Sequence, residues 1–502
     1  MKFRQILLFV ILWFSFCIYA EKKTNVMLEQ CDELTFDKQG GRDYQVLRGN
    51  VRFRHDDVVM FCDSAYFYDG KNSFDAFGHV RVFQNTETSM FSDSMFYDGN
   101  TTLMRVRGNV ELRSGTSSLK TRFLDYYRDK NYGYYYGGGE VYDSNYHLTS
   151  YQGYYYNDSK SYLFKDTVRL YHPDYTIHAD SLRYNQNTSK AMLIGPSSIY
   201  GKDYMVYTTR GWTYTNSDVG RLYNHSVILY KKGRRLTADS IAFDSKNGRV
   251  KAYQDAEVQD STQKLIVRGE YMECDRTSPA YLKVLGNPYV IDYSDNDSLY
   301  LRADTLHYLE IDSLHEELRA YHRVRFYRTD LQGKCDSLVY FMKDSMAVMY
   351  DDPILWSEGN QLTGNGTIEI YIKDQKPEKI HIPIKAFIVS DEKYDLYNQL
   401  SGKEAFAYIE HNKLRRIDLI GDANSLYYSK DEKGALIGLN KAIGPEMSIY
   451  TKNNKLDKII MTPESEGIMY PPNKIPDEER FLKNFSWRED ERPKSKEDIF
   501  KK

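Results

Sequence analysis

The sequence predicts an all-β protein, an elongated, creased antiparallel stack of about twelve two-strand repeats of about 30 residues each. Two short motifs recur along the chain with one shared period. Inside both motifs, apolar and polar residues alternate with the period of two that is typical of half-buried strands. The 46 tyrosines and 23 phenylalanines among 502 residues also favour strands over helices.

The first twenty residues have the layout of a secretory signal. Lys2 and Arg4 precede an apolar run over residues 6–16, and the segment closes at Ala20 before charged residues. The run is shorter than the ~20 residues that span a bilayer, which favours cleavage, although an uncleaved anchor stays open. We therefore expect the mature chain to lie outside the cytoplasm.

The first motif reads small residue, acid, Ser or Thr, apolar residue, any residue, aromatic residue. Aligned carboxylates could bind calcium or cleave glycans. In a meander, however, equivalent residues lie two strands apart, ~9.6 Å, so we expect these acids to satisfy backbone groups freed by a bend. The clearest acid positions are Asp63, Asp93, Asp180, Asp239, Asp304 and Asp336.

The second motif is of the Gly-Asn-Val type and lies between copies of the first. It is clear at residues 49–53, 78–82 and 108–112, with weaker echoes at 168–170 and 227–229. The small residues inside the two motifs predict a crease in each strand, of the kind that glycines and bulges produce. Asp-Gly and Asn-rich turn formers follow the acid motif, so each repeat reads as two long strands.

The apolar positions of these strands could line a trough for acyl chains, where each buried CH₂ contributes ~0.8 kcal/mol. They could equally form a dry core between closed sheets, and both interpretations remain open. The predicted lipid-binding residues are Val51, Phe53, Val80, Val82, Val110, Leu112, Val168, Leu170, Leu182, Val227, Leu229 and Ile241.

Other chemistry is poorly supported. The net charge of −3 gives no dominant basic face, so we expect no nucleic-acid partner. Cys31, Cys62 and Cys335 occupy the small position before the acid and should be buried small residues. The sequence has no zinc-protease, phosphate-loop or nucleophile-elbow motif, so we predict no cofactor, no metal site, no catalytic residue and no enzymatic activity.

Gly-Asn-Val strands alternating with Asp-Ser strands behind a secretory signal resemble the organic-solvent-tolerance (OstA-like) domain family, which includes the periplasmic lipopolysaccharide-transport bridge proteins. The likeness spans about residues 26–370. It implies a β-taco or jelly-roll fold that carries lipopolysaccharide acyl chains between the two membranes and serves outer-membrane assembly. It also implies lipopolysaccharide or lipid A and the inner- and outer-membrane transport components as partners. Association with either membrane, and head-to-tail self-association through edge strands, stay open.

The domain organisation follows from these segments. We expect a signal peptide at 1–20, the OstA-like repeat domain at 26–370, and atypical repeats at 371–470 that cap the stack. Residues 471–502 are rich in charge and proline and should form an extended or disordered tail.

Two other functions remain open. The chain could be an extracytoplasmic β-solenoid scaffold or adhesin that binds only proteins. It could also be a glycan-active β-helix enzyme, but such an enzyme needs its acids concentrated in one repeat, and here they are spread evenly.

Overall fold

The protein is almost entirely β-strand. The computed structural model describes residues 24–36, 43–84, 88–143, 146–275, 277, 279–312, 315–410, 413–431, 433–452 and 455–501. The predicted signal at 1–20 lies outside these residues. Over the described ranges, no helix has the length and apolar content that crossing a membrane requires. The prediction of an all-β antiparallel fold with creased strands is confirmed.

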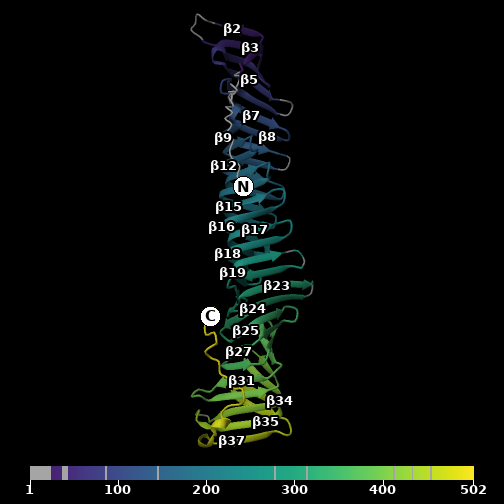
Figure 1. The fold of residues 1–502 in the computed structure, drawn as a ribbon, viewed down its shortest axis with the longest axis vertical. Helices are drawn as coiled ribbons and strands as arrows, with labels where there is room; N and C mark the ends of the chain where they lie inside the picture. The colour runs from purple at the N-terminus through teal and green to yellow at the C-terminus, as the bar shows by residue number, and fades with distance from the viewer. Residues whose placement is uncertain are drawn as a thin grey trace, which may run out of the picture. The chain divides into compact units, whose positions relative to one another are not determined.

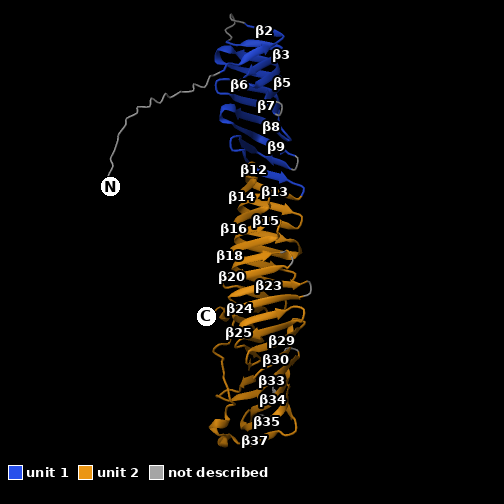
Figure 2. Ribbon diagram, turned by 45° about the vertical axis from the view of Figure 1, so that its right-hand side comes forward, with its two compact units in different colours: residues 1–173 blue, residues 174–502 orange. Residues whose placement is uncertain are grey.

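The chain divides into two compact units, residues 1–173 and 174–502 (Figure 2). The range 26–370, predicted from the motifs as one repeat domain, is therefore shared between the two. Within each unit, strands that follow one another in the sequence are stacked in order, as the colour gradient of Figure 1 shows.

Unit 1 is an antiparallel meander of strands of about a dozen residues, as the repeat predicts. Two short 3₁₀ turns, η1 (Asp69–Lys71) and η2 (Arg128–Lys130), connect hairpins. Its strands are β1 (Met27–Gln30), β2 (Glu33–Thr35), β3 (Gln45–His55), β4 (Val58–Tyr68), β5 (Ser73–Gln84), β6 (Thr88–Asp98), β7 (Leu103–Ser114), β8 (Ser117–Tyr127), β9 (Tyr132–Tyr142), β10 (His147–Ser150), β11 (Gln152–Tyr156) and β12 (Ser161–Tyr171).

Unit 2 continues the same antiparallel pattern. Its strands are β13 (Tyr175–Asn185), β14 (Lys190–Gly201), β15 (Tyr204–Tyr214), β16 (Val219–Tyr230), β17 (Arg234–Asp244), β18 (Arg249–Asp260), β19 (Leu265–Asp275), β20 (Tyr281–Leu285), β21 (Tyr289–Asp292), β22 (Leu299–Arg302), β23 (Thr305–Asp312), β24 (His315–Arg328), β25 (Leu331–Phe341), β26 (Met346–Tyr350), β27 (Ile354–Ser357), β28 (Asn360–Thr363), β29 (Thr367–Lys373), β30 (Lys376–Ile382), β31 (Ala386–Asp391), β32 (Tyr397–Gly402), β33 (Glu404–Glu410), β34 (Lys413–Lys430), β35 (Leu436–Lys452), β36 (Lys455–Met461) and β37 (Glu466–Tyr470). Its 3₁₀ turns are η3 (Lys231–Gly233), η4 (Pro472–Lys474), η5 (Asp477–Glu479) and η6 (Asp498–Phe500).

The crease is marked by one or two residues with left-handed backbone angles in the middle of alternate long strands. In β5, Gly78 and His79 have φ of +74° and +39°, and in β7, Gly108 and Asn109 have +72° and +40°. The ladder shifts register at these points, so each strand bends there and continues in a second direction. The Gly-Asn-Val motif is thus the sequence signature of the bend.

The crease divides each unit into two arms that fold against each other. In unit 1, arm 1 contains 64–68 of β4 and 73–77 of β5, and arm 2 contains 58–62 and 80–84 of the same strands. In unit 2, arm 1 contains 240–244 of β17 and 249–253 of β18, and arm 2 contains 234–238 and 256–260. The strands that pair with these segments extend each arm across its unit.

Towards its C-terminal end, unit 2 keeps both arms but the strands become shorter. The pair β27–β28 lies in arm 2 and the pair β29–β30 in arm 1. The long strands return at β34 and β35, which cross the crease again. The chain therefore forms separate hairpins in the two arms here, which explains why the repeat loses its register in the sequence after residue 365.

Residues 471–501 differ from the disordered tail that their composition suggests. This segment returns along unit 2, where Figure 1 shows it in yellow beside the strands. Ile499 is fully buried, and the Phe500 ring lies 5.2 Å from that of Tyr289. Apolar side chains spaced between the charges give the segment enough buried contact to offset the cost of ordering it.

Candidate functional site

The candidate site is the interior between the two arms, which is lined by unbroken cross-strand rows of apolar residues. The row in arm 2 of unit 1 joins every long strand through directly opposed residues. It runs through Phe53, Met60, Val82, Met90, Leu112, Leu119, Val141, Leu148 and Leu170. The facing row in arm 1 runs through Leu47, Ala65, Ala76, Met95, Val106, Leu124, Tyr135, Gly153 and Phe164.

Unit 2 repeats this arrangement with longer rows. In arm 1 the row is Leu182, Leu193, Gly211, Leu222, Ile241, Ala252, Met272, Val284, Leu306, Ala320, Leu338, Met349 and Ile368. In arm 2 it is Ile177, Ile199, Val206, Ile228, Leu236, Val258, Val267, Val290, Leu301, Phe326, Gly333, Leu355, Leu362, Ile388, Leu400, Ser425 and Ala442. Tyr135, through its hydroxyl, and Ser425 are the polar side chains in these four rows, and none of their residues is charged.

Ten of the twelve predicted lining residues lie on this inner face. These ten residues differ only in how deeply they are buried. The fully buried residues are Val51, Phe53, Val80, Val82, Val110, Val168, Leu182 and Ile241. Leu112 and Leu170 are half-buried.

Val227 and Leu229 lie on the opposite face of β16. Leu229 pairs with the exposed Arg235, whereas its neighbour Ile228 is buried and pairs with buried Leu236. In the arm 2 part of β16, the inward residues are therefore Ser226 and Ile228. The left-handed pair here is Asn224–His225, one residue earlier than an alignment on Val227 suggests.

The first motif also supplies inward residues that the predicted lining omitted. Its apolar position places Ala65 and Met95 in the arm 1 row, and its aromatic position places Phe67 and Tyr97 beside them. The apolar and aromatic positions of the motif are two residues apart, so the sequence alternation itself indicates that both side chains point inward. Arm 1 is thus encoded by the Asp-Ser motif and arm 2 by the Gly-Asn-Val motif.

Side chains from the two arms fill the interior. In unit 1, Phe53 of arm 2 stacks on Phe74 of arm 1, with ring centroids 4.0 Å apart. His55 Nδ1 lies 2.5 Å from the Tyr97 hydroxyl and its Nε2 lies 2.7 Å from Thr24 Oγ1. Burial raises the pKa of Tyr97, and raises that of Tyr135 to about 12, so both phenols stay neutral. His55, Tyr97 and Tyr135 are thus hydrogen-bonded polar groups on an otherwise mainly apolar inner face.

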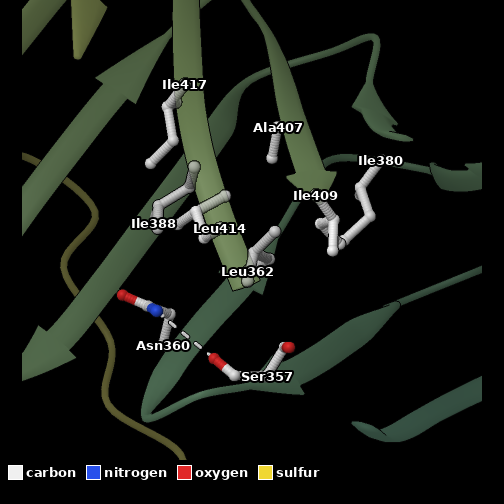
Figure 3. Close-up of a pocket in the computed structure, with 9 residues that line it drawn as sticks. All are labelled: Ser357, Asn360, Leu362, Ile380, Ile388, Ala407, Ile409, Leu414 and Ile417. Carbon is white, nitrogen blue, oxygen red and sulfur yellow. Dashed lines mark hydrogen bonds between the residues drawn. The ribbon is translucent and has the colours of Figure 1, made fainter. Parts of the chain in front are cut away.

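Between the arms of unit 2, near their free ends, lies a small cavity (Figure 3). Its volume of about 20 Å³ is enough for one water-sized group. Arm 1 contributes Ile380, Ala407, Ile409, Leu414 and Ile417, and arm 2 contributes Ser357, Asn360, Leu362 and Ile388. At this point the arms are in contact and hold no acyl-chain-sized space.

A few polar bridges join the free ends of the arms. In unit 1, Arg128 Nη2 lies 2.5 Å from Asp56 Oδ2. In unit 2, Lys376 Nζ lies 3.6 Å from Asp295 Oδ2, and the Leu414 amide donates to Glu358 Oε2 at 3.3 Å. An exposed pair such as Lys376–Asp295 contributes ~0–1 kcal/mol and holds the free ends weakly. The Arg128 side chain is only 16% exposed, so this estimate does not extend to its pair with Asp56.

The aligned acids lie outside this interior, at the crease. Asp63 Oδ2 is 2.7 Å from His79 Nδ1, and Asp93 Oδ2 accepts a hydrogen bond from Asn109 Nδ2 at 2.9 Å. Asp63 and Asp93 therefore bind the second residue of the left-handed pair on the following strand, as Asp304 does through Arg323, whereas Asp239 and Asp336 contact His225 and His322 on the preceding strand. Across the part of the chain that the structure describes, no three His, Cys, Asp or Glu side chains come together as a metal site would require. This arrangement supports the structural role expected for the acids.

The cysteines follow the same pattern. Cys62 and Cys335 are buried beside the crease, and burial raises the pKa of each thiol to about 12. Cys31 and Cys274 are half-buried, and none of the four forms a disulfide. They act as small apolar residues in these positions.

Comparison with known proteins finds a family match in the N-terminal part of the chain. Residues 23–180 match the model of the family described as OstA-like protein. Among solved structures, the chain is similar to LptH, described as the LptA homologous periplasmic component of the conserved lipopolysaccharide transport device from Pseudomonas aeruginosa. The identity is 16%, the TM-score is 0.22, and the alignment covers 28% of this chain and 95% of LptH. No curated protein matches this chain. The OstA-like match over residues 23–180 includes all the strands of unit 1.

Proposed function

We propose that the chain is a non-enzymatic bridge of lipopolysaccharide transport in the periplasm, and that its two-armed interior shelters lipid acyl chains on their way to the outer membrane. The observation that carries this proposal is the pair of facing apolar rows, which continue across every long strand of each unit. The OstA-like match at residues 23–180 supports it, since the family includes such bridges. The secretory signal expected at residues 1–20 agrees with the location.

The energetics of the rows suit a sliding cargo. Each CH₂ moved from water into the interior contributes ~0.8 kcal/mol, so a chain that inserts ten methylenes gains ~8 kcal/mol before the cost of opening the arms. Because neighbouring strands present near-equivalent apolar residues, advancing by one strand changes this energy little. The rows thus favour retention of the lipid without fixing its position.

The described structure is the closed state of this interior, because the rows pack against each other. A lipid would enter by parting the arms at their free ends. Of the contacts described there, Lys376–Asp295 and Glu358–Leu414 involve exposed or half-exposed groups. Breaking them costs little, so the apolar contact between the arms would set the cost of opening, and the incoming acyl chain would replace that contact.

The two faces of β16 provide a matched test. A photo-crosslinking amino acid at Ile228 points into the interior, and one at the adjacent Leu229 points out of it. In cells, we expect Ile228 to capture lipopolysaccharide and Leu229 to capture little. Capture at neither position, or equal capture at both, would remove the support for an internal lipid path and would favour a protein-binding scaffold.

A further inference from the structure

The outer face of arm 2 in unit 2 carries an apolar surface that residues 471–501 cover. Leu426, Tyr428 and Leu439 form a buried cluster against which Ile475 and Leu482 pack. The Tyr397 ring lies 5.2 Å from that of Phe485. This surface lies on the opposite side of the strands from the proposed lipid path, because Leu426 neighbours Ser425 of the inner row.

Two buried glutamines hold the main chain of this segment. Gln399 Nε2 donates to the Arg480 carbonyl and its Oε1 accepts from the Leu482 amide, both at 2.8 Å. Gln361 makes the same pair of bonds at 2.7 Å, to the Ser486 carbonyl and the Arg488 amide. Each side-chain amide therefore reads a carbonyl and an N–H two residues apart, which is the pattern that a neighbouring strand offers.

The two glutamines belong to one cross-strand row on the outer face. Opposed residues along it are Gln332, Trp356, Gln361, Val389 and Gln399. Gln332 accepts from Arg492 Nε at 2.9 Å. Trp356, which lies between Gln332 and Gln361, is fully buried, and its Nε1 has no hydrogen-bond partner among the described residues. The row thus contains two glutamines that bind the main chain of the segment, Gln361 and Gln399, which we call the clamps. Between and beside them lie apolar side chains, which form the floor of the surface, and the indole N–H of Trp356, which donates no hydrogen bond to the described residues.

The segment is attached to the sheet through side chains. Among the described residues, each main-chain to main-chain hydrogen bond made by residues 471–501 joins positions three apart within the segment itself. Ion pairs add to the clamps: Arg488 binds Asp352 through two bonds of 2.7 and 2.8 Å, and Glu491 pairs with Lys334. The segment can therefore leave without breaking any strand ladder.

We propose that this outer face is a binding site for an extended peptide, and that residues 479–500 of the chain are its resident, reversibly bound ligand. The clamps recognise the main chain of any extended segment, and the apolar floor selects aromatic and aliphatic side chains. The acidic and basic partners Asp352 and Lys334 set the direction of the bound peptide. The ligand class is thus an extended peptide with alternating aromatic and charged residues, which is the chemistry of the chain's own tail.

The test uses the full-length chain and a fluorescent synthetic peptide with the sequence of residues 471–502. In the wild type the resident tail should compete with the peptide. Replacing Trp487 and Arg488 by alanine loosens the tail without touching a strand, so the peptide should bind this variant at least about tenfold more tightly, as fluorescence anisotropy would measure. Adding Gln361→Ala and Gln399→Ala should reverse the gain by about tenfold or more, because it removes both clamps. Gln263→Ala, in an exposed turn, is the matched control and should change nothing.

Hydrogen exchange distinguishes a bound ligand from a part of the fold. In the loosened variant, the tail amides should exchange faster while the amides of β25, β27, β28 and β32 keep their protection. Loss of protection in these strands would overturn the proposal, since the tail would then be an integral layer of the sheet. Equal peptide binding by the wild type and the loosened variant, or none by a variant whose tail has been released, would overturn it as well.

Discussion

Substituting the glycine of one crease tests whether the left-handed pair creates the bend. Gly78 has a φ of +74°, and a Cβ atom at this position would lie 2.4 Å from Asp63 Oδ2. Gly78→Ala therefore adds two costs. The left-handed conformation costs ~1–2 kcal/mol for a residue with a Cβ. Displacing the carboxylate weakens its exposed contact with His79, ~0.5–1 kcal/mol. We expect a local destabilisation of ~1.5–3 kcal/mol.

Native-state hydrogen exchange of the β4 and β5 amides is the appropriate assay, because a stack of repeats opens locally rather than all at once. Gly70→Ala is the matched control, since no atom lies within 4 Å of the Cβ it would gain and it lies in the turn η1. Asp63→Ala should cost less in the Gly78→Ala background than in the wild type, because Gly78→Ala has already weakened the Asp63–His79 contact. If the β4 and β5 amides exchange at the same rate in the Gly78→Ala and Gly70→Ala variants, the link between the motif and the bend is refuted.

Three further outcomes are expected. Ile228→Asp should destabilise β16 by ~3 kcal/mol or more because it buries a charge, whereas Leu229→Asp should cost under ~1 kcal/mol. Hydrogen exchange of the β16 amides compares the two variants, and equal losses of stability would contradict the assigned faces. A hydrogen bond from Arg488 and further contacts lower the pKa of Glu491 from 4.5 to about 2. The stabilisation from this lowered pKa is present above pH 4.5 and is lost as the pH falls towards 2, so exchange in the tail should accelerate over that range, and Glu491→Gln should abolish the dependence. The buried thiol of Cys62, whose pKa is raised to about 12, should resist alkylation at pH 8 under conditions that modify the half-buried cysteines. Mass spectrometry measures the modification of each cysteine, and rapid alkylation of Cys62 would contradict the prediction.

The crease and most of the lining follow from the sequence because glycine marks the bend. In β7, Gly108–Asn109 occupies the left-handed pair, and every second residue after it points inward. In β16 the pair is Asn224–His225, and the missing glycine leaves valine as the only visible anchor. Asparagine tolerates the left-handed region, so the bend survives where its sequence signal fades, and the inferred register slips by one residue.

The tail could not be placed from the sequence for a different reason. Its composition resembles that of disordered segments, and only the aromatic residues, such as Phe485 and Trp487, indicate that it can dock. The glutamines that hold it are dispersed over β25, β28 and β32, and strand register alone aligns them. Such a row exists only after the arm has folded.

The crease also restricts how this architecture can change in length. Inserting or deleting a single residue within an arm would move every following side chain of that strand segment to the opposite face of the sheet. Apolar residues would then be exposed and charged residues buried. Adding a whole pair of strands, by contrast, preserves the parity of both arms and the alignment of the bends. Evolution should therefore lengthen or shorten such a protein in steps of one repeat, about 30 residues. The number of repeats then sets the length of the stack.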